Sequence, residues 1–493
     1  MDTASTLPVL AIVIPVVTAI CIVLARRTPV LRDVLLFAGA AVTFVVIAGM
    51  VPAVLRGEVP TSTLGALIPG LEVRLQADGM GMVFALLASF LWVLASSYAA
   101  GYVRGADERH QTRFAVFYAL CLATTFGVAF SADLFTFFVF YELLTATTYP
   151  LVTHKGTDEA IRAGRKYLGF LLSGGVAVLL GLIIVVQRTG DVAFAPGGFI
   201  GDSLGPTLTT VVFLLFAVGF GTKAGLMPLH AWLPAAMVAP TPVSALLHAV
   251  AVVKAGVFAF GRLIGFVFGP DVLRGEFVAT LLAVVAGTTI VVASGIALRQ
   301  DHLKRRLAYS TIAHLAYIVL AFALLSPSGF QGALLHIVNH GAIKITLFFC
   351  AGAIYVHTKR DRVSQLDGIG RKMPVTMTAF AIASLGLVGL PPMGGFVSKW
   401  TMVRGAYESG HTVLAALMVL SGLLTAAYLF PIVLRAFFRP AAQPGDRERD
   451  DASPLMVAPL AITAGVALLL GLGDWLSFGA LTANVAATVM GGR

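Results

Sequence analysis

Five ionisable side chains lie inside long apolar stretches of this chain. They are Glu142, Lys223, Lys254, Lys344 and Lys399. A charged group at the centre of a bilayer costs about 2.5–3.5 kcal/mol on insertion scales. Burial disfavours the charged form of a lysine and a nearby carboxylate favours it again, so such a lysine can release and take up a proton. The five residues therefore predict proton transfer, with Glu142 and Lys223 acting as a switching pair.

Histidines add groups that exchange protons near neutral pH. His336, His340 and Lys344 follow one another at i, i+4 and i+8, so they share one face of a helix. We predict a water-lined proton path over this face. His248, six residues before Lys254, and His230 are predicted to belong to the same path.

Two bland alternatives stay open for the histidines and for Lys399. His314 has about equal chances of being a carrier or a hydrogen-bonded packing residue, and Lys399 lies near the end of its segment, where a lysine can reach the headgroups. Histidines four residues apart, such as His336 and His340, can also share zinc. No third Cys, Asp or Glu lies near them in sequence, so we expect no metal site.

The composition requires a lipid environment for these groups. Of 493 residues, 58% are hydrophobic and only 12% are charged, about half the usual charged fraction. Cys21, Cys121 and Cys350 form no paired motif, and no nucleotide-binding or zinc-protease motif is present, so we expect no cofactor and no bond-making chemistry within the chain. The net charge of +10 is better explained by membrane topology than by nucleic acid.

We expect about fourteen membrane-spanning helices, because a helix needs about 20 apolar residues to cross the hydrocarbon. The segments are 5–25, 30–52, 78–101, 112–130, 133–154, 163–187, 209–229, 241–265, 277–298, 307–325, 330–356, 374–402, 412–438 and 454–478. The first has no basic stretch before it and no clear cleavage site, so it is predicted to be a retained helix rather than a signal peptide.

The basic residues support this count. Most of the 34 lysines and arginines fall in alternate loops, such as Arg26–Arg32 and Arg299–Arg306. Cytoplasmic loops carry the excess of basic residues. Both termini are therefore expected on the non-cytoplasmic side.

Two segments are interrupted. In the seventh, Lys223 is followed by Pro228 and Pro234, and in the twelfth the stretch GLPPMGGFVSKW leads to Lys399. Unwound backbone at membrane depth survives only where protein or water satisfies it, and paired broken helices are typical of transporters built from inverted repeats. The breaks lie five segments apart, which predicts two inverted five-helix repeats.

Four stretches resemble the antiporter-like membrane subunits of respiratory complex I, Mrp-type cation/proton antiporters and membrane-bound hydrogenases. They are TKAGLMPLHAWLPAAMVAPTPVSALLHAVAVVKAG, RLAYSTIAHLAYIVL, HIVNHGAIKITLFFCAGAI and GLPPMGGFVSKW. The resemblance runs from about residue 78 to about 440. It implies fourteen helices, broken seventh and twelfth helices and lateral proton hopping along a polar axis, with Glu142, Lys223, Lys254, Lys344 and Lys399 as carriers and His248, His336 and His340 beside them.

Within that family, the Ala235–Val238 stretch lacks the acidic residue and histidine that complex I relatives often have there, and it looks more like Mrp-type and hydrogenase-type subunits. The chain also ends soon after the fourteenth segment, which favours a D-like Mrp subunit. The implied domains are N-terminal helices 1–3 (1–110), a first repeat of helices 4–8 (111–265), a second repeat of helices 9–13 (266–440) and a C-terminal helix 14 (441–493).

We therefore expect a proton-translocating subunit of a multisubunit monovalent cation/proton antiporter in a bacterial or archaeal cytoplasmic membrane. The alternative is the pump module of a complex I-like or hydrogenase-like redox complex, with electron transfer in other subunits. The expected partners are other membrane subunits, the lipid bilayer and protons, with Na⁺ or K⁺ as the candidate cation. Glu142 and Thr145 only hint at a sodium site, which needs clustered oxygens.

Overall fold

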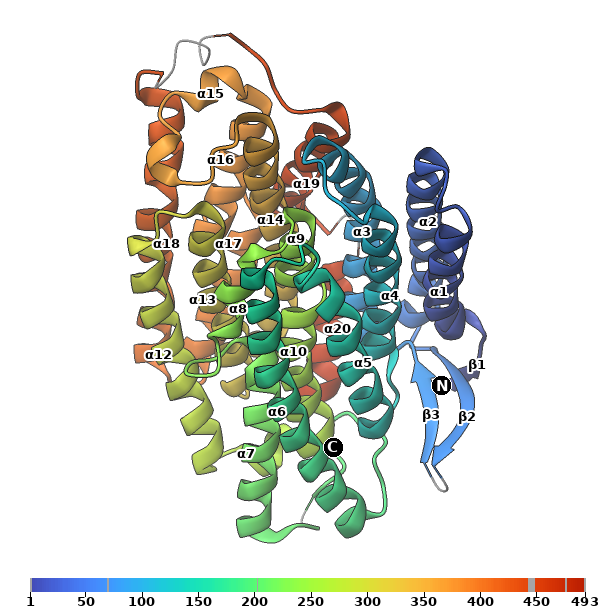
Figure 1. Cartoon of the computed structure of the whole chain (residues 1–493). Coiled ribbons are helices and arrows are strands. Elements are labelled where there is room, and N and C mark those ends of the chain that lie inside the picture. The colour runs from blue at the N-terminus through green and yellow to red at the C-terminus, as the bar shows by residue number, and fades with distance from the viewer. Residues whose placement is uncertain (1, 69–70, 202, 442–447, 475–476, 492–493) are drawn as a thin grey trace.

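The computed structural model describes residues 2–68, 71–201, 203–441, 448–474 and 477–491. In this part of the chain, thirteen helices are long and apolar enough to cross a membrane. A further segment is split into α16 (Pro374–Val388) and α17 (Gly394–Glu408). Together they match the predicted count of about fourteen and form one upright bundle (Figure 1). The protein is therefore an all-α polytopic membrane protein.

The spanning helices follow the predicted segments closely. The first seven are α1 (Leu7–Leu24), α2 (Pro29–Leu55), α3 (Gly79–Gly105), α4 (Gln111–Phe130), α5 (Leu134–Val152), α6 (Asp158–Thr189) and α7 (Gly205–Ala224). The eighth span consists of α9 (Thr241–Ala249), α10 (Val252–Arg262) and η2 (Leu263–Phe268). The others are α12 (Phe277–Arg299), α13 (Leu303–Ala323), α14 (Pro327–Thr358), α18 (Thr412–Phe438) and α19 (Pro454–Leu472).

Short elements connect the spans. They are α8 (Trp232–Ala235), η1 (Ala236–Val238), α11 (Pro270–Leu273), η3 (Val363–Gln365), α15 (Ile369–Lys372) and the C-terminal α20 (Phe478–Met490). A sheet of β1 (Asp2–Ala4), β2 (Val59–Ile68) and β3 (Leu71–Gln76) lies beside the bundle, with β1 parallel and β3 antiparallel to β2. The sequence predicted neither this sheet nor a separate α20.

The most buried helices are α14 and the α9–α10 span. Every residue of their most apolar stretches is buried, whereas the share is 33% in α1, α2, α18 and α19. A helix that is buried all round needs no polar outer face, so its polar residues must find partners inside the protein. Lys254, His336, His340 and Lys344 lie on these two central elements.

Both predicted breaks are present. Helix α7 ends at Gly225, with φ +70°, and α16 ends at Gly389, with φ +89°. Glycine suits such left-handed ends because it has no Cβ to clash. A third break, which the sequence did not predict, separates α9 from α10 at Val250 and Ala251. It lies between His248 and Lys254 and contains neither proline nor glycine.

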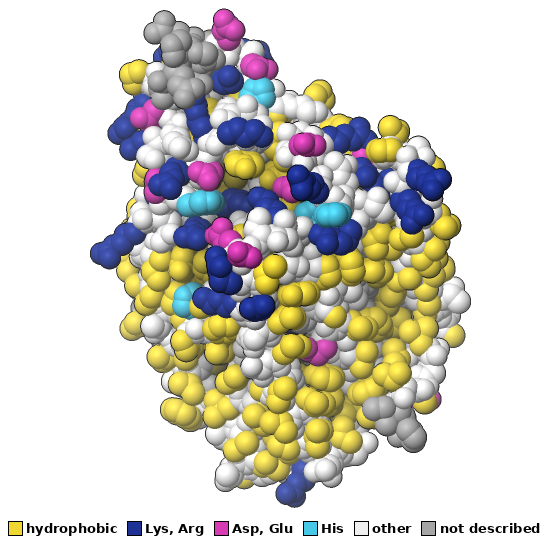
Figure 2. Space-filling view, viewed as in Figure 1, with side chains coloured by type: hydrophobic (Ala, Val, Ile, Leu, Met, Phe, Trp, Pro, Cys, Tyr) yellow, Lys and Arg dark blue, Asp and Glu magenta, His cyan; other side chains and the backbone are white. Residues whose placement is uncertain are grey.

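Charge is distributed unevenly over the surface. Figure 2 shows most of the visible Lys and Arg side chains on the upper part of the molecule, above a band of hydrophobic side chains. The N- and C-terminal ends lie in the lower half of the same view (Figure 1). This separation agrees with the expected topology, in which the basic side faces the cytoplasm. The predicted domain boundaries stay predictions.

Candidate functional site

The structure buries all four predicted lysines inside the bundle. Their exposed fractions are 1% for Lys223, 0% for Lys254 and Lys344, and 8% for Lys399. None of them forms an ion pair with a carboxylate in the described part of the chain. Their ammonium groups are instead held by carbonyl, hydroxyl and imidazole groups, which are weaker partners that can leave a proton free to move.

Glu142 and Lys223 are neighbours without forming a direct salt bridge. Lys223 Nζ donates a hydrogen bond to the carbonyl of Tyr141, the residue before Glu142, and lies 3.3 Å from the centroid of the Tyr141 ring. Glu142 is half-buried, and its Oε1 has no hydrogen-bond partner among the described residues. The carboxylate therefore has freedom to approach or leave Lys223, as the predicted switch requires.

Glycines on neighbouring helices make this arrangement possible. A Cβ at Gly175 of α6 would lie 2.6 Å from Glu142 Oε1, so only glycine leaves the carboxylate in its place. A Cβ at Gly256 of α10 would lie 2.4 Å from Ala224 N, so α10 packs directly against the end of α7. Close backbone approach of this kind is the usual role of small residues between membrane helices.

The two lysines beside the predicted breaks contact backbone that the breaks set free. Lys399 Nζ donates to the carbonyl of Val388, the last residue of α16, over 3.0 Å. A cation at the C-terminal end of a helix satisfies a free carbonyl and the helix dipole. At the other break Trp232 Nε1 donates to Thr222 O over 2.8 Å. Lys399 is thus buried at a helix end and does not reach the headgroups.

Lys254 is paired with a histidine across the centre of the bundle. Its Nζ lies 2.8 Å from His340 Nδ1, which joins α10 to α14. His340 Nε2 has no hydrogen-bond partner in the described structure. The His340 ring stacks against His314 of α13 with centroids 5.5 Å apart.

His314 lies at the centre of the histidine cluster, so the carrier alternative that the sequence left open has geometric support. His314 Nδ1 is 3.1 Å from His336 Nε2, and His336 Nδ1 is 2.9 Å from Ser398 Oγ. Ser398 is the residue before Lys399. The cluster connects α13, α14 and α17, with His314 in stacking contact with both His336 and His340.

Lys344 is bonded to hydroxyl groups rather than to the two histidines on its own helix. Its Nζ donates to Ser310 Oγ over 2.8 Å and to Leu307 O over 3.0 Å. The sequence predicted one path along the face shared by His336, His340 and Lys344. The structure instead directs these three side chains to different partners on α13, α10 and α17, so the predicted path along α14 has no direct bonds in the described structure.

The remaining two predicted histidines are not directly bonded to this network. His248 is fully buried and stacks on Phe348 with centroids 4.7 Å apart, and neither of its ring nitrogens has a partner among the described residues. His230 lies between α7 and α8, where its ring is 6.2 Å from the Tyr309 ring and its Nδ1 is also unpartnered in the described part. Buried polar atoms without partners are places where water is expected.

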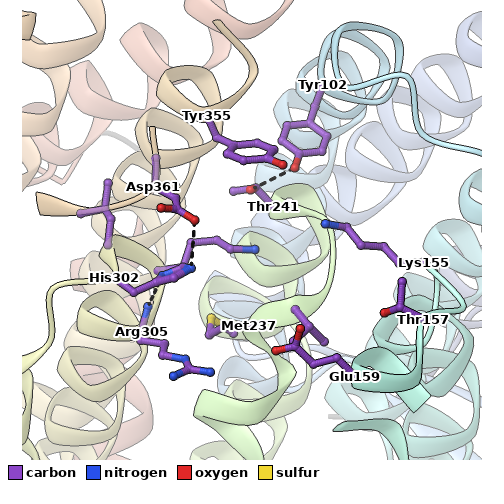
Figure 3. A pocket seen from close by; sticks show the side chains of 14 residues that line it. Tyr102, Lys155, Thr157, Glu159, Met237, Thr241, His302, Arg305, Tyr355 and Asp361 are labelled. Atoms are coloured by element: carbon purple, nitrogen blue, oxygen red, sulfur yellow. Dashed lines mark hydrogen bonds and ion pairs between the residues drawn. The ribbon is translucent and has the colours of Figure 1, made fainter. Parts of the chain in front are cut away.

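A polar cavity opens on the basic side of the molecule. It has a volume of about 440 Å³ and lies between the start of α6, the start of α9, the start of α13 and α14. Figure 3 shows Lys155 and Glu159 on one side and an ion pair of His302 and Asp361, 3.7 Å apart, on the other. Burial lowers the pKa of His302. The cavity reaches Thr241, the first residue of the helix that carries His248.

Several polar residues of the site were missed by reasoning from the sequence. They are Ser310, Ser398, Thr425 and Tyr428. Their only signal is helical spacing: Ser310 lies four residues before His314, and Thr425 three before Tyr428. In the described residues no three His, Cys, Asp or Glu side chains come together as metal ligands.

Known proteins with related sequences match this chain over most of its length. Residues 131–425 match a family model described as NADH:quinone oxidoreductase/Mrp antiporter, TM. The chain is 34% identical to the N subunit of the NADH-quinone oxidoreductase of Desulforudis audaxviator, over 91% of this chain and 90% of that protein. It is 27% identical to the D subunit of the Na⁺/H⁺ antiporter of Bacillus subtilis, over 95% of this chain and 94% of that protein.

A solved structure shares the fold. A chain of the Mrp complex from Dietzia sp. DQ12-45-1b superimposes with a TM-score of 0.87 at 23% identity, covering 98% of this chain and 97% of that one. At this identity the match supports the architecture alone.

Proposed function

Because the chain belongs to the NADH:quinone oxidoreductase/Mrp antiporter transmembrane family, we propose that it is a proton-translocating subunit of a multisubunit monovalent cation/proton antiporter. The observation that carries the proposal is the central file of buried Lys and His side chains without carboxylate partners. Titratable groups in such surroundings are expensive and are typical of proton paths.

Protons enter this file from the basic side in our proposal. The cavity beside Lys155, Glu159 and Asp361 is polar and open, and it ends near α9. From there water reaches His248, whose two unpartnered ring nitrogens suit hydrogen bonds to water. The proton then passes to the Lys254–His340 pair and to the His314–His336 cluster.

The Glu142–Lys223 pair supplies the switch. When the free carboxylate approaches Lys223, the ammonium form is favoured, and when it withdraws, Lys223 gives up its proton. Glu142 lies on the partly exposed side of α5, so its position can respond to a neighbouring subunit. Lys399 at the α16–α17 break is the terminal carrier of the second half.

A second candidate function is the pump module of a redox complex. It is favoured by the identity of 34% to the N subunit of the NADH-quinone oxidoreductase, which is higher than the 27% to the D subunit of the antiporter. In that case electron transfer occurs in other subunits and this chain moves protons by the same residues. In either case the proposed location is a bacterial or archaeal cytoplasmic membrane, and the partners are other membrane subunits.

The test uses the whole complex purified with its native partners and reconstituted into liposomes with an internal pH-sensitive dye. The antiporter function predicts that added Na⁺ or K⁺ drives proton movement without any electron donor, and that iron–sulfur proteins are absent from the complex. Proton movement that needs NADH or another donor, with no response to either cation, would instead support the redox complex. No proton movement under either condition would contradict both.

A further inference from the structure

A row of hydroxyl groups connects Lys344 to the histidine cluster through helix α18. Ser310 Oγ lies 2.9 Å from the Tyr428 hydroxyl. Tyr428 donates to Thr425 Oγ1 over 3.2 Å, and Thr425 Oγ1 lies 3.5 Å from His314 Nε2. With the bond from Lys344 to Ser310, the row spans from one proposed carrier to another without a gap. All of these side chains are fully buried.

The hydrogen bonds in this row can all point the same way. Lys344 donates to Ser310, and because Tyr428 spends its one hydrogen on Thr425, Ser310 is left to donate to Tyr428. A Thr425 hydroxyl that donates to His314 needs Nε2 without hydrogen. The His314 hydrogen is then on Nδ1, which suits donation to His336 Nε2.

The same direction continues to the second break. With its own hydrogen on Nδ1, His336 donates to Ser398 Oγ over 2.9 Å, and Ser398 donates to Gly395 O over 3.2 Å. The row therefore ends beside Lys399. Chains of hydrogen bonds oriented in one direction strengthen one another in a low-dielectric interior.

We propose that Ser310, Tyr428 and Thr425 form a hydroxyl relay that carries a proton from Lys344 to His314, so that α18 takes part in proton transfer. The relay rests on the proposed proton-translocating function and adds a route to it. It explains how Lys344 can deliver a proton although it has no direct bond to His336 or His340 in the described structure.

The transfer is a series of hydrogen exchanges between neighbouring oxygens. An Nζ–H bond of protonated Lys344 breaks as an O–H bond forms on Ser310, whose own hydrogen passes to Tyr428. Tyr428 passes its hydrogen to Thr425, and Thr425 passes one to His314 Nε2. Lys344 ends neutral, His314 ends as an imidazolium, and each hydroxyl has exchanged one hydrogen for another. Rotation of the hydroxyls then restores the starting direction.

Thr425 is the point at which the relay opens and closes. Its hydroxyl lies 2.8 Å from the backbone carbonyl of Ser421 and 3.5 Å from His314 Nε2. A hydroxyl has a single hydrogen, so in this geometry it rests on the Ser421 carbonyl. Proton transfer to His314 requires the hydrogen to turn away from that carbonyl, and the distance to shorten by a few tenths of an ångström.

The first test replaces Tyr428 by phenylalanine in the assembled complex. Tyr428→Phe removes one hydroxyl and keeps the ring. We expect proton flux into proteoliposomes to fall at least tenfold and the solvent deuterium isotope effect on the flux to change. The matched control is Tyr98→Phe, because Tyr98 is equally buried but its hydroxyl donates only to the backbone carbonyl of Phe349, over 2.8 Å. Wild-type flux in Tyr428→Phe would overturn the relay.

A second pair of variants keeps the proposal testable if Tyr428→Phe does not assemble. Thr425→Val keeps the shape and removes the hydroxyl, whereas Thr425→Ser keeps the hydroxyl. The relay predicts low flux in the valine variant and near wild-type flux in the serine variant. Equal flux in both, whether high or low, would overturn it.

Lys344→Met separates failure of the relay from failure of the proposed function. If Lys344→Met abolishes flux while Tyr428→Phe and Thr425→Val do not, the relay is wrong and the proton path stands. If Lys344→Met itself transports normally, the proposed function fails.

Discussion

Lys344→Met is the substitution that distinguishes most sharply between a functional and a structural lysine. Lys344 is fully buried, and its two hydrogen-bond acceptors are Ser310 Oγ and Leu307 O. Both acceptors keep other partners without it, since Ser310 still contacts the Tyr428 hydroxyl and Leu307 O still accepts from Thr311 Oγ1 over 3.0 Å. Methionine has nearly the same length and no charge.

The expected change in stability follows from these contacts. Removing a lysine from the centre of the bilayer returns about 2.5–3.5 kcal/mol on insertion scales. The two lost hydrogen bonds cost about 0.5–1.5 kcal/mol each. No buried group is orphaned, so the net effect is stabilisation of roughly 1 kcal/mol. The variant should therefore melt at the same temperature as the wild type or slightly above it, while proton flux is lost.

The assay measures both quantities on one preparation. The purified complex is heated in detergent while tryptophan fluorescence is followed, and the same sample is reconstituted for dye-based proton flux. A structural lysine would give the opposite pattern, with a clearly lower melting temperature and normal flux in the surviving complex. That pattern would refute the reasoning for Lys344.

Three further predictions use the same complex. Gly175→Ala should displace the Glu142 carboxylate and lower proton flux several-fold, whereas Gly169→Ala on the same helix, where a Cβ meets nothing within 4 Å, should leave flux unchanged; equal flux in the two would contradict the close contact. Glu142→Gln should reduce flux at least tenfold with normal assembly on size-exclusion chromatography, and normal flux would remove the switch. Burial lowers the pKa of His154 to about 4, so between pH 6.5 and 4 the unfolded chain binds a proton that the folded chain does not, and stability falls as the pH drops through this window. His154→Phe should flatten the melting temperature across it, and an unchanged slope would contradict the assignment.

The helices could be predicted from the sequence because apolar length is sufficient information for a membrane span. The segment 133–154, for example, corresponds to α5 at Leu134–Val152. The breaks at Gly225 and Gly389 were also predictable, since proline and glycine signal them locally. The break at Val250 and Ala251 was not, because nothing in AVAVVKAG marks it and packing around the fully buried span imposes it.

The carriers were predictable as residue types, but not their connections. Lys254 and Lys344 stand out because charge is rare in apolar segments. Spacing along α14 places His336, His340 and Lys344 on one face, yet each is bonded to a different neighbouring helix. Hydroxyl residues are common in membrane helices and carry no insertion cost that would single them out, so nothing in the sequence distinguishes Tyr428 from the other tyrosines.

The most direct test of the account is the proton flux of the reconstituted complex after Lys223, Lys254, Lys344 and Lys399 have all been replaced by methionine. If protons move by stepping between these buried groups, the assembled variant shows no flux above that of empty liposomes under an imposed cation or pH gradient. Flux at the wild-type rate in that variant would contradict the account.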